Sequence, residues 1–406
     1  MRFLYVASGI PVPGTLGGST HTIEVARGLA ARGHVVHVVA CAQPGWHGLA
    51  PLARPVSTRN DMFMLHQIDL PKAASLLAAP LIDRLLQAVR PDIVIERYYN
   101  FAGGGLLAAR RHGLPSILEV NALIIDPPAV FKRRLDDALG GPLCRWATAQ
   151  CRMADRIITP LHTTVPAAIA RTKIVELPWG ANVDRFAVGG QGSGVRGQPA
   201  LQELRIPEPQ PLNPLVLFLG SFRAWHGVMD FVGAARRLLE SGRDVRFVLV
   251  GDGPERAEAE RAAAAWPSRF TFTGAVPYEH VPALLAEAAI GVAPFNTAPH
   301  PALRAAGFFW SPLKIYEYMA AGLPVVTPDI APLNRIIRAG REGVLYPEGD
   351  VAALAAAIGR LLDAPEQAKA MGLAARARVV AQYSWARHCA ELERIAEEVR
   401  QTHSPR

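Results

Sequence analysis

Short apolar runs alternate with amphipathic segments along the whole chain. Residues 2–8 form an apolar run that predicts a strand, and residues 19–32 follow with apolar positions on one helical face. Gly33 and His34 end that helix, and a second apolar run occupies residues 35–40. Strand, helix and strand in this order form a βαβ unit. We therefore expect a parallel sheet that binds its ligand at the carboxyl ends of the strands.

The alternation of apolar runs and amphipathic segments occurs in two sets. The first set occupies residues 1–186 and the second residues 214–383. Residues 187–213 are rich in Gly, Pro and Gln and have little apolar periodicity, which predicts a linker. Residues 384–406 read as a C-terminal helix and a frayed tail. The fold class expected is therefore α/β, with two Rossmann-like parallel-sheet domains that face each other across a cleft.

Two helical stretches of the first domain contain residues that break helices. Residues 73–89 are interrupted near Pro80, and residues 131–154 are interrupted at positions 140–142. The second stretch carries five basic and two aromatic side chains, which are Lys132, Arg133, Arg134, Arg145, Arg152, Phe131 and Trp146. Such a helical stretch lies either on an anionic membrane or in solvent as a charged face.

The stretch from Ser311 to Asp329 reads as a helix followed by a strand. Ser311 is a good N-cap and Pro312 suits the first helical position. The amides of Leu313 and Lys314 then point out of the helix start, where the helix dipole favours an anion. Glu317 lies one turn further on. This helix either grips both ends of a nucleotide, with diphosphate on the amides and ribose on Glu317, or it is a capped core helix with one exposed acid.

Composition and charge narrow the class of ligand. The chain has 406 residues, of which 50% are hydrophobic and 19% are charged, which is typical of a globular protein. Its formal charge of +8 suits phosphorylated ligands or an anionic membrane face. No motif supports nucleic-acid binding. Four scattered cysteines, no leader-like N-terminus and no apolar run of membrane-spanning length predict a cytoplasmic protein.

Glycine-rich turns follow several of the predicted strands. Glycines allow a ligand to approach the backbone closely, although a plain turn between strand and helix has the same pattern. The candidate ligand-binding positions in these turns are Gly17, Gly18, Gly220, Gly251, Gly274 and Val276. We find no zinc spacing, P-loop, nucleophile elbow or Asp-x-Asp pair, so neither a metal nor a bound cofactor is expected.

Taken in order, these turns and the helix at Ser311 resemble the family 4 glycosyltransferases of the GT-B fold. The string GGSTHTIEVARGLAARGHVVHVV resembles the glycine loop, helix and strand of that family, and PWGANVDRF resembles the segment that closes its first domain. The resemblance implies a retaining, metal-independent transfer of a sugar from a nucleoside diphosphate sugar to a glycan or glycolipid hydroxyl. It also implies a role in cell-surface polysaccharide or glycolipid synthesis, at the inner face of the membrane if the basic helical stretch binds lipid.

The resemblance assigns roles to four residues and shows two departures. Arg223 matches the arginine that holds the diphosphate, His226 takes the place of the family's lysine, and Glu317 matches the second acid of the E-x7-E motif, which grips the ribose. The first acid of that motif is replaced by Phe309, which places the contacts to the donor sugar in question. Asn121 stands where many relatives have a histidine, and it cannot accept a proton at neutral pH.

These residues support an electrostatic mechanism. Arg223, a protonated His226 and the two helix amides would stabilise the charge that develops on the leaving diphosphate. For Arg223 a surface ion pair is the alternative, and for His226 it is helix capping. Two other functions remain open, namely a sugar-nucleotide epimerase of the same architecture and a non-catalytic subunit that binds a nucleotide sugar.

Overall fold

The computed structural model describes residues 1–14, 17–42, 55–60, 62–186 and 213–403. The chain divides into two compact units of similar size. The first unit comprises Met1–Trp179, Phe309–Ser311 and Trp385–Arg406, and the second comprises Gly180–Phe308 and Pro312–Ser384. The chain therefore returns to the first unit twice, once in a three-residue segment and once in the C-terminal helix. The predicted linker falls on residues 187–212, which lie outside the described residues, and on Asn213.

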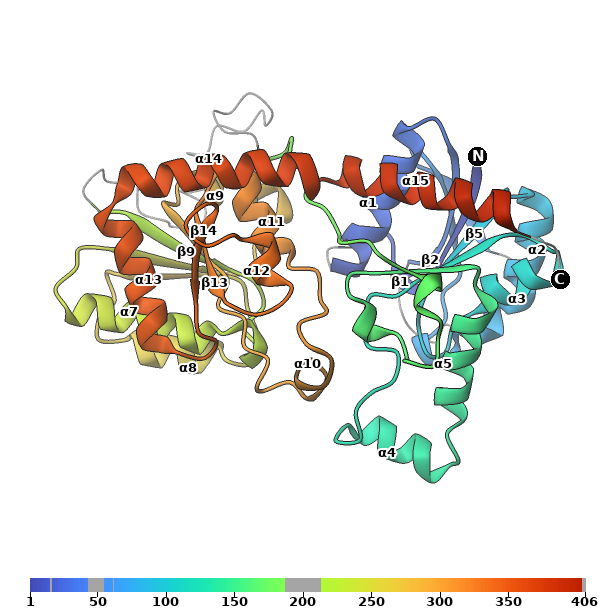
Figure 1. Cartoon of the computed structure of the whole chain (residues 1–406), viewed down its shortest axis with the longest axis horizontal. Helices are drawn as coiled ribbons and strands as arrows, with labels where there is room; N and C mark the ends of the chain where they lie inside the picture. Colours follow the sequence, from blue (N-terminus) through green and yellow to red (C-terminus); the bar gives the residue numbers. More distant parts are fainter. Residues whose placement is uncertain (15–16, 43–54, 61, 187–212, 404–406) are drawn as a thin grey trace. The chain divides into compact units, whose positions relative to one another are not determined.

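The first unit is built on an eight-stranded sheet in the order β3-β4-β2-β1-β5-β6-β7-β8 (Figure 1). All neighbouring pairs are parallel except β3 and β4, which are antiparallel. The strands are β1 (Arg2–Pro11), β2 (Val35–Cys41), β3 (Val56–Arg59), β4 (Met64–Gln67), β5 (Ile93–Arg97), β6 (Ser116–Glu119), β7 (Arg156–Thr159) and β8 (Ile174–Glu176). The parallel arrangement confirms the expectation from the βαβ pattern.

Most of the described helices of the first unit bury apolar side chains. The described α-helices of this unit are α1 (Gly17–Ala31), α2 (Ala79–Val89), α3 (Gly104–Arg111), α4 (Phe131–Ala138), α5 (Pro142–Met153) and α15 (Trp385–Thr402). One apolar cluster joins α2 and α3 to β1 and β5, and another joins α3 and α5 to β6 and β7. Both predicted breaks are confirmed, since α2 begins only at Ala79 after a 3-10 turn and residues 139–141 separate α4 from α5.

The second unit holds a six-stranded, fully parallel sheet in the order β11-β10-β9-β12-β13-β14. Its strands are β9 (Leu215–Leu219), β10 (Arg246–Val250), β11 (Phe270–Gly274), β12 (Ile290–Val292), β13 (Val325–Pro328) and β14 (Gly343–Tyr346). Its helices are α7 (Val228–Glu240), α8 (Arg256–Ala263), α9 (Val281–Ala286), α10 (Pro301–Ala306), α11 (Leu313–Ala320), α12 (Leu333–Ile336), α13 (Val351–Asp363) and α14 (Pro365–Gln382). Its core joins α7 and α13 to β9 and β10.

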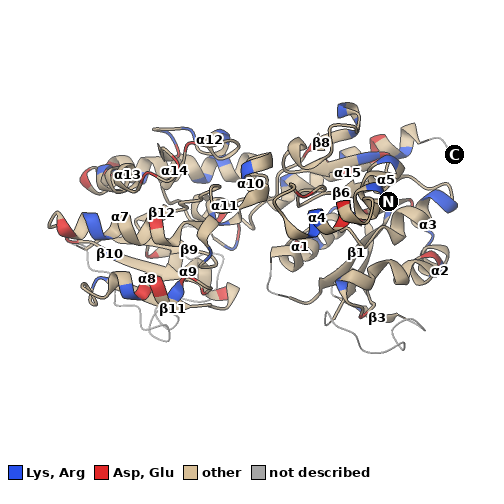
Figure 2. Ribbon diagram, turned by 90° about the horizontal axis from the view of Figure 1, so that it is seen from below, with Lys and Arg blue, Asp and Glu red and all other residues tan. Residues whose placement is uncertain are grey.

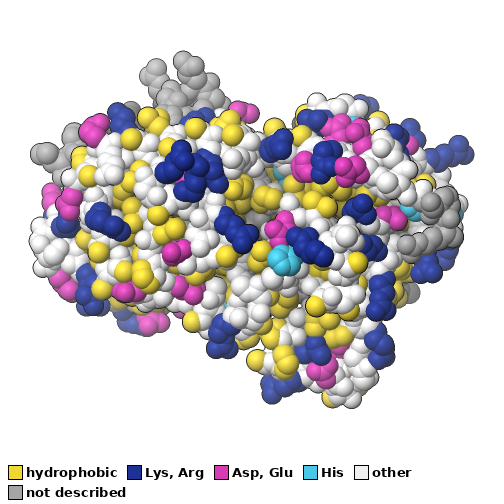
Figure 3. Space-filling model, viewed as in Figure 1, with side chains coloured by type: hydrophobic (Ala, Val, Ile, Leu, Met, Phe, Trp, Pro, Cys, Tyr) yellow, Lys and Arg dark blue, Asp and Glu magenta, His cyan; other side chains and the backbone are white. Residues whose placement is uncertain are grey.

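Helix α4 stands out on the surface of the first unit. Phe131, Leu135 and Leu139 are four residues apart and therefore lie on one helical face, with exposed fractions of 72%, 50% and 67%. Lys and Arg residues accompany them on the same short helix, where the ribbon of α4 is partly blue in Figure 2 and basic side chains lie beside apolar ones in Figure 3. The buried Asp136 anchors the helix, because its carboxylate accepts hydrogen bonds from the amides of Leu143 and Cys144 at the start of α5. No helix among the described residues is long and apolar enough to cross a membrane.

Candidate functional site

Three glycines line the carboxyl edge of the second unit's sheet. Gly220, Gly251 and Gly274 end or follow the adjacent strands β9, β10 and β11. The Gly251 amide donates to the Gly274 carbonyl at 2.9 Å, and the Gly220 amide donates to the Val250 carbonyl at 2.9 Å. Gly251 has a φ of +134°, and a Cβ there would overlap the carbonyl oxygen of Gly220. At Gly251 backbone therefore packs against backbone, and a ligand-binding role for these three glycines and for Val276, in the turn after β11, stays a prediction.

The loop from Gly220 to Gly227 is held by backbone contacts and by a buried phenylalanine, and it carries one exposed cation. The Phe222 amide donates to the Asp252 carbonyl at 2.8 Å, and the Phe222 side chain is fully buried. Gly227 has a φ of +71° and lies against the Pro294 carbonyl, where no side chain fits. The exposed Arg223 places its guanidinium carbon 5.2 Å from the centre of the Trp225 ring. This contact holds an exposed cation close to the sheet edge.

Helix α11 starts differently from the sequence prediction. Its N-cap residue is Pro312, not Ser311, and no side chain caps it. The Ser311 hydroxyl oxygen instead accepts a hydrogen bond from the Trp179 amide at 3.3 Å, within the first unit. The first carbonyl of α11, that of Pro312, accepts from the amide of Ile315 at 2.9 Å. The amides of Leu313 and Lys314 therefore have no acceptor within the helix, and anion binding at this helix start stays a prediction.

Glu317 is buried one turn along α11 from its start. Only 7% of the residue is exposed, and its Oε1 accepts a hydrogen bond from the Tyr278 hydroxyl at 2.9 Å. The Arg185 guanidinium lies 5.0 Å from the centre of the Tyr278 ring. Burial raises the pKa of Glu317 to about 7, although Tyr278, Lys314 and Arg185 each act to lower it. A carboxyl group held in this way is an acceptor for hydroxyl groups of a ligand.

The cation beside the glycine loop is Lys314 and not His226. A Cβ at Gly220 would come within 2.6 Å of Lys314 Nζ and 3.1 Å of His226 Nδ1. Burial and the neighbouring Lys314 lower the pKa of His226 to about 2, so the imidazole is neutral and lies 3.1 Å from the Ser221 hydroxyl. His226 is therefore uncharged in the ligand-free protein, against the expectation of a protonated imidazole, and its contact with a ligand stays a prediction. Burial lowers the pKa of Lys314 to about 7, so this amine is about half protonated at neutral pH and charged below it.

Phe309 is held in an apolar setting. It is buried and packs edge-on against Trp310, with 5.5 Å between ring centres. It belongs to the three-residue segment that is counted with the first unit. Residues 297–316 contain no acid at all. No carboxylate of this stretch therefore takes the place of the missing first acid.

A second polar cluster lies at the carboxyl edge of the first unit's sheet. Glu119 accepts hydrogen bonds from the Tyr5 hydroxyl at 2.6 Å, from Arg97 at 3.1 Å and from the Asn121 amide. The Asn121 oxygen in turn accepts from Trp179 Nε1 at 2.7 Å. Both ends of the Asn121 amide thus have partners, and one Nδ2 hydrogen remains for a ligand. Asn121 is a positioned donor and not a base.

The paired glycines of the first unit lie beside this cluster. Gly17 and Gly18 form the first turn of α1, and a Cβ at Gly18 would lie 3.7 Å from Arg97 Nη2. Sequence reasoning included these glycines but missed Arg97 and Glu119. One signal could have found them. Arg97 is the last residue of β5 and Glu119 the last residue of β6, and these two buried strands are neighbours in the sheet, so the two side chains lie at the same edge.

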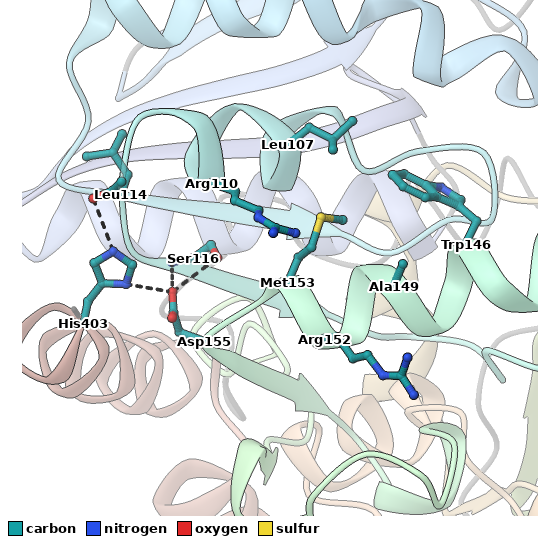
Figure 4. A pocket seen from close by; sticks show the side chains of 11 residues that line it. Leu107, Arg110, Leu114, Ser116, Trp146, Ala149, Arg152, Met153, Asp155 and His403 are labelled. Atoms are coloured by element: carbon teal, nitrogen blue, oxygen red, sulfur yellow. Dashed lines mark hydrogen bonds and ion pairs between the residues drawn. The ribbon is translucent and has the colours of Figure 1, made fainter. Parts of the chain in front are cut away.

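A crevice of about 410 Å³ lies elsewhere in the first unit, between α3 and α5 (Figure 4). Ser116, at the start of β6, and Asp155, just before β7, line it together with His403. Asp155 accepts from the Ser116 amide at 2.8 Å and lies 3.2 Å from the His403 imidazole. The crevice is thus at the amino ends of the strands, away from the edge where sheets of this kind bind ligands. No group of acidic, histidine or cysteine residues suited to a metal ion occurs among the described residues.

Comparison with known proteins identifies the family. The family "Glycosyltransferase Family 4" matches residues 16–185, and the family "Glycosyl transferases group 1" matches residues 213–364. A GDP-mannose-dependent alpha-mannosyltransferase of Mycobacterium tuberculosis is 28% identical over 94% of this chain and 92% of its own length. An alpha-D-kanosaminyltransferase of Streptomyces kanamyceticus is 27% identical over 68% of this chain and 69% of its own length.

Solved structures share the fold. HepE of Anabaena, described in complex with UDP and glucose, has a TM-score of 0.67 and is 18% identical, with 98% of this chain and 100% of that chain covered. The two family matches together cover the N-terminal and the C-terminal halves of the chain, and both are families of glycosyltransferases. The chain belongs to the family 4 glycosyltransferases and is a glycosyltransferase with the two parallel-sheet domains of the GT-B fold.

Proposed function

We propose that this enzyme moves a sugar from a nucleoside diphosphate sugar to a hydroxyl of a glycan or glycolipid, with retention of the anomeric configuration. One observation carries the proposal. Arg223, the free amides of α11 and the buried pair Lys314 and Glu317 gather at a glycine-lined sheet edge within one unit. Cationic and amide donors suit a diphosphate, and a buried carboxylate one turn further along suits the ribose hydroxyls.

The chemistry that these groups support is stabilisation of the leaving group. Negative charge grows on the β-phosphate as the bond to the sugar breaks, and preorganised donors at this edge lower the energy of that state. We propose that the leaving phosphate itself takes the proton of the acceptor hydroxyl, on the face where the new bond forms. The neutral Asn121 then positions a hydroxyl of the sugar or the acceptor and takes no proton. No resident metal enters this scheme.

The first unit is proposed to bind the acceptor and to lie on an anionic membrane through α4. The exposed apolar face of Phe131, Leu135 and Leu139 is flanked by basic side chains, which is the composition of helices that bind anionic lipid surfaces. A glycolipid acceptor would be reached there, at the inner face of the membrane, in the synthesis of cell-surface polysaccharide or glycolipid. The two relatives described above are named for the sugar they transfer and not for its acceptor, so the acceptor is proposed from this surface.

Sedimentation with vesicles tests the membrane contact. The wild-type protein is expected to sediment with vesicles that contain phosphatidylglycerol and not with pure phosphatidylcholine. The double substitution Phe131→Ser and Leu135→Ser should reduce binding at least tenfold, because burying each apolar side chain contributes about 1.5–3 kcal/mol. Leu373→Ser, at an exposed leucine of α14, is the matched control and should bind as wild type does. Equal binding by the double variant would show that α4 is not the contact.

Turnover with and without an acceptor tests the activity. One relative is named for GDP-mannose, and one solved structure contains UDP, so the base of the donor is left open. UDP-, GDP- and ADP-sugars are therefore screened first by thermal shift, because a ligand that binds only the folded state raises its melting temperature. The donor found is then incubated with lipid and oligosaccharide acceptors. Acceptor-dependent release of the nucleoside diphosphate supports the proposal. A changed sugar nucleotide without an acceptor would instead indicate an epimerase.

Phe309 favours one second candidate, a subunit that binds a nucleotide sugar without turnover. The family's first acid is absent from this chain, and the structure supplies no other carboxylate from residues 297–316. Under this alternative the donor raises the melting temperature, and no acceptor in the panel leads to nucleoside diphosphate release.

A further inference from the structure

Lys314 has an unusual position for a charged side chain. Only 7% of the residue is exposed, and its ammonium nitrogen is buried without a hydrogen-bond partner among the described residues. Its Nζ instead lies 4.5 Å from the centre of the Phe218 ring and 4.7 Å from that of Phe295. Burying an ammonium without acceptors is costly, and contacts with two ring faces offset only part of that cost. The folded protein therefore keeps a cation that is costly for its own stability.

The surroundings of Lys314 point to an anionic ligand at the start of α11. Its Nζ is beside Gly220, just after β9, where a Cβ would come within 2.6 Å of the ammonium. The same residue contributes one of the two free amides of α11. Its nearest acid, Glu317, hydrogen-bonds to Tyr278 and forms no ion pair with Lys314 among the described residues. The ammonium and the helix start thus offer donors to the same ligand.

Resting on the proposed function, we infer that the Lys314 ammonium neutralises the diphosphate of the donor, in place of the lysine that the loop lacks at His226. The neutral imidazole of His226 then serves as a spacer that hydrogen-bonds to Ser221 and keeps the loop beside Lys314. Arg223 supplies the second, solvent-exposed cation. In this arrangement one cation comes from the loop and the other from the helix.

Binding of nucleotides that differ in phosphate number tests this role directly. Calorimetric titration compares UDP with UMP, GDP with GMP and ADP with AMP on the wild-type protein, on Lys314→Met and on Lys369→Met. Lys369 is an exposed lysine of α14 in the same unit and serves as the matched control. For the base that binds, Lys314→Met should reduce the preference for diphosphate over monophosphate by about 10- to 100-fold, the scale of a lost charge-assisted hydrogen bond. Monophosphate affinity and the behaviour of Lys369→Met should stay as in the wild type.

The melting temperature without ligand is the second measurement. Methionine fits the apolar surroundings, so Lys314→Met is expected to raise it while weakening the diphosphate preference. An unchanged preference in Lys314→Met overturns the inference, whatever happens to the melting temperature. A wild-type protein that binds diphosphates without any preference over monophosphates overturns it too, although a nucleotide site would remain. If the wild type binds none of the six nucleotides, the proposed function fails and this inference fails with it.

Discussion

Replacing Glu317 with glutamine should make the protein more stable above neutral pH and weaken its hold on the donor. The buried carboxyl has its pKa raised from the ordinary 4.5 to about 7. Between these values the folded protein keeps a proton that the unfolded chain has lost, so stability falls as the pH rises from about 4.5 to 7 and the loss is complete above 7. The rise in pKa corresponds to about 3 kcal/mol. Glutamine carries no charge at any of these pH values and still accepts from the Tyr278 hydroxyl.

Thermal unfolding at a series of pH values measures this effect. For a unit of this size about 3 kcal/mol corresponds to roughly 6–12 °C. We expect Glu317→Gln to melt with the wild type at pH 4.5 and higher by up to that amount at pH 8. Nucleotide affinity at pH 8 should fall, because a neutral amide accepts ribose hydroxyls less strongly than a carboxylate does. The ionised Glu317 of the wild type thus lowers the stability of the folded protein and strengthens nucleotide binding.

A matched control substitution and two possible outcomes test the role of Glu317. Glu279→Gln, at an exposed acid next to Tyr278 in the sequence, should leave both the pH dependence and the affinity unchanged. If Glu317→Gln melts below the wild type at pH 8, the carboxylate is held for structural reasons and the reasoning is refuted. An unchanged nucleotide affinity would remove Glu317 from the ribose.

Three further substitutions test the donor edge. Arg223→Ala should lower turnover by roughly 100-fold or more with an unchanged melting temperature, the scale of a lost oxyanion donor; a lower melting temperature with normal specific activity would mark a structural role. Gly220→Ala should weaken diphosphate binding, because its Cβ meets Lys314 Nζ at 2.6 Å and its φ is +144°; normal affinity would mean that Lys314 moves freely. His226→Gln should keep the shape of the pH–rate profile from pH 5.5 to 9, because the wild-type imidazole is already neutral; loss of a limb in the variant would show that His226 titrates during turnover.

The sequence predicted the sheets well because most of their strands are buried on both faces. Strands such as β5 and β10 are buried at every position, and their sequences, IVIER and RFVLV, contain apolar runs of three and four residues. The strand β3 was missed because all four of its residues are exposed, so it has no apolar signal. The six-residue helix α10 was also missed, since a segment this short shows little periodicity.

Within the site, the sequence identified candidate residues but did not predict their protonation states or all of their hydrogen-bond partners. Ser311 has the side chain of an N-cap, yet its hydroxyl is hydrogen-bonded to Trp179, a contact between residues 132 positions apart. His226 and Lys314 are separated by 88 positions in the chain. Only the fold brings them to the same glycine and so determines which of them carries the proton. The partner of Ser311 and the charges of His226 and Lys314 thus depend on burial and on residues distant in the sequence. A local sequence pattern does not contain this information.

Hydrogen–deuterium exchange of the full chain, with and without the nucleoside diphosphate found in the screen, tests the central claim most directly. The account predicts that the ligand slows amide exchange in residues 220–227, 251–254 and 313–317, and that Glu317→Gln and Lys314→Met weaken this protection. The amides of Leu313 and Lys314 should change most, because they have no acceptor within α11. Protection confined to the crevice between α3 and α5, with no change at these three segments, would contradict the account.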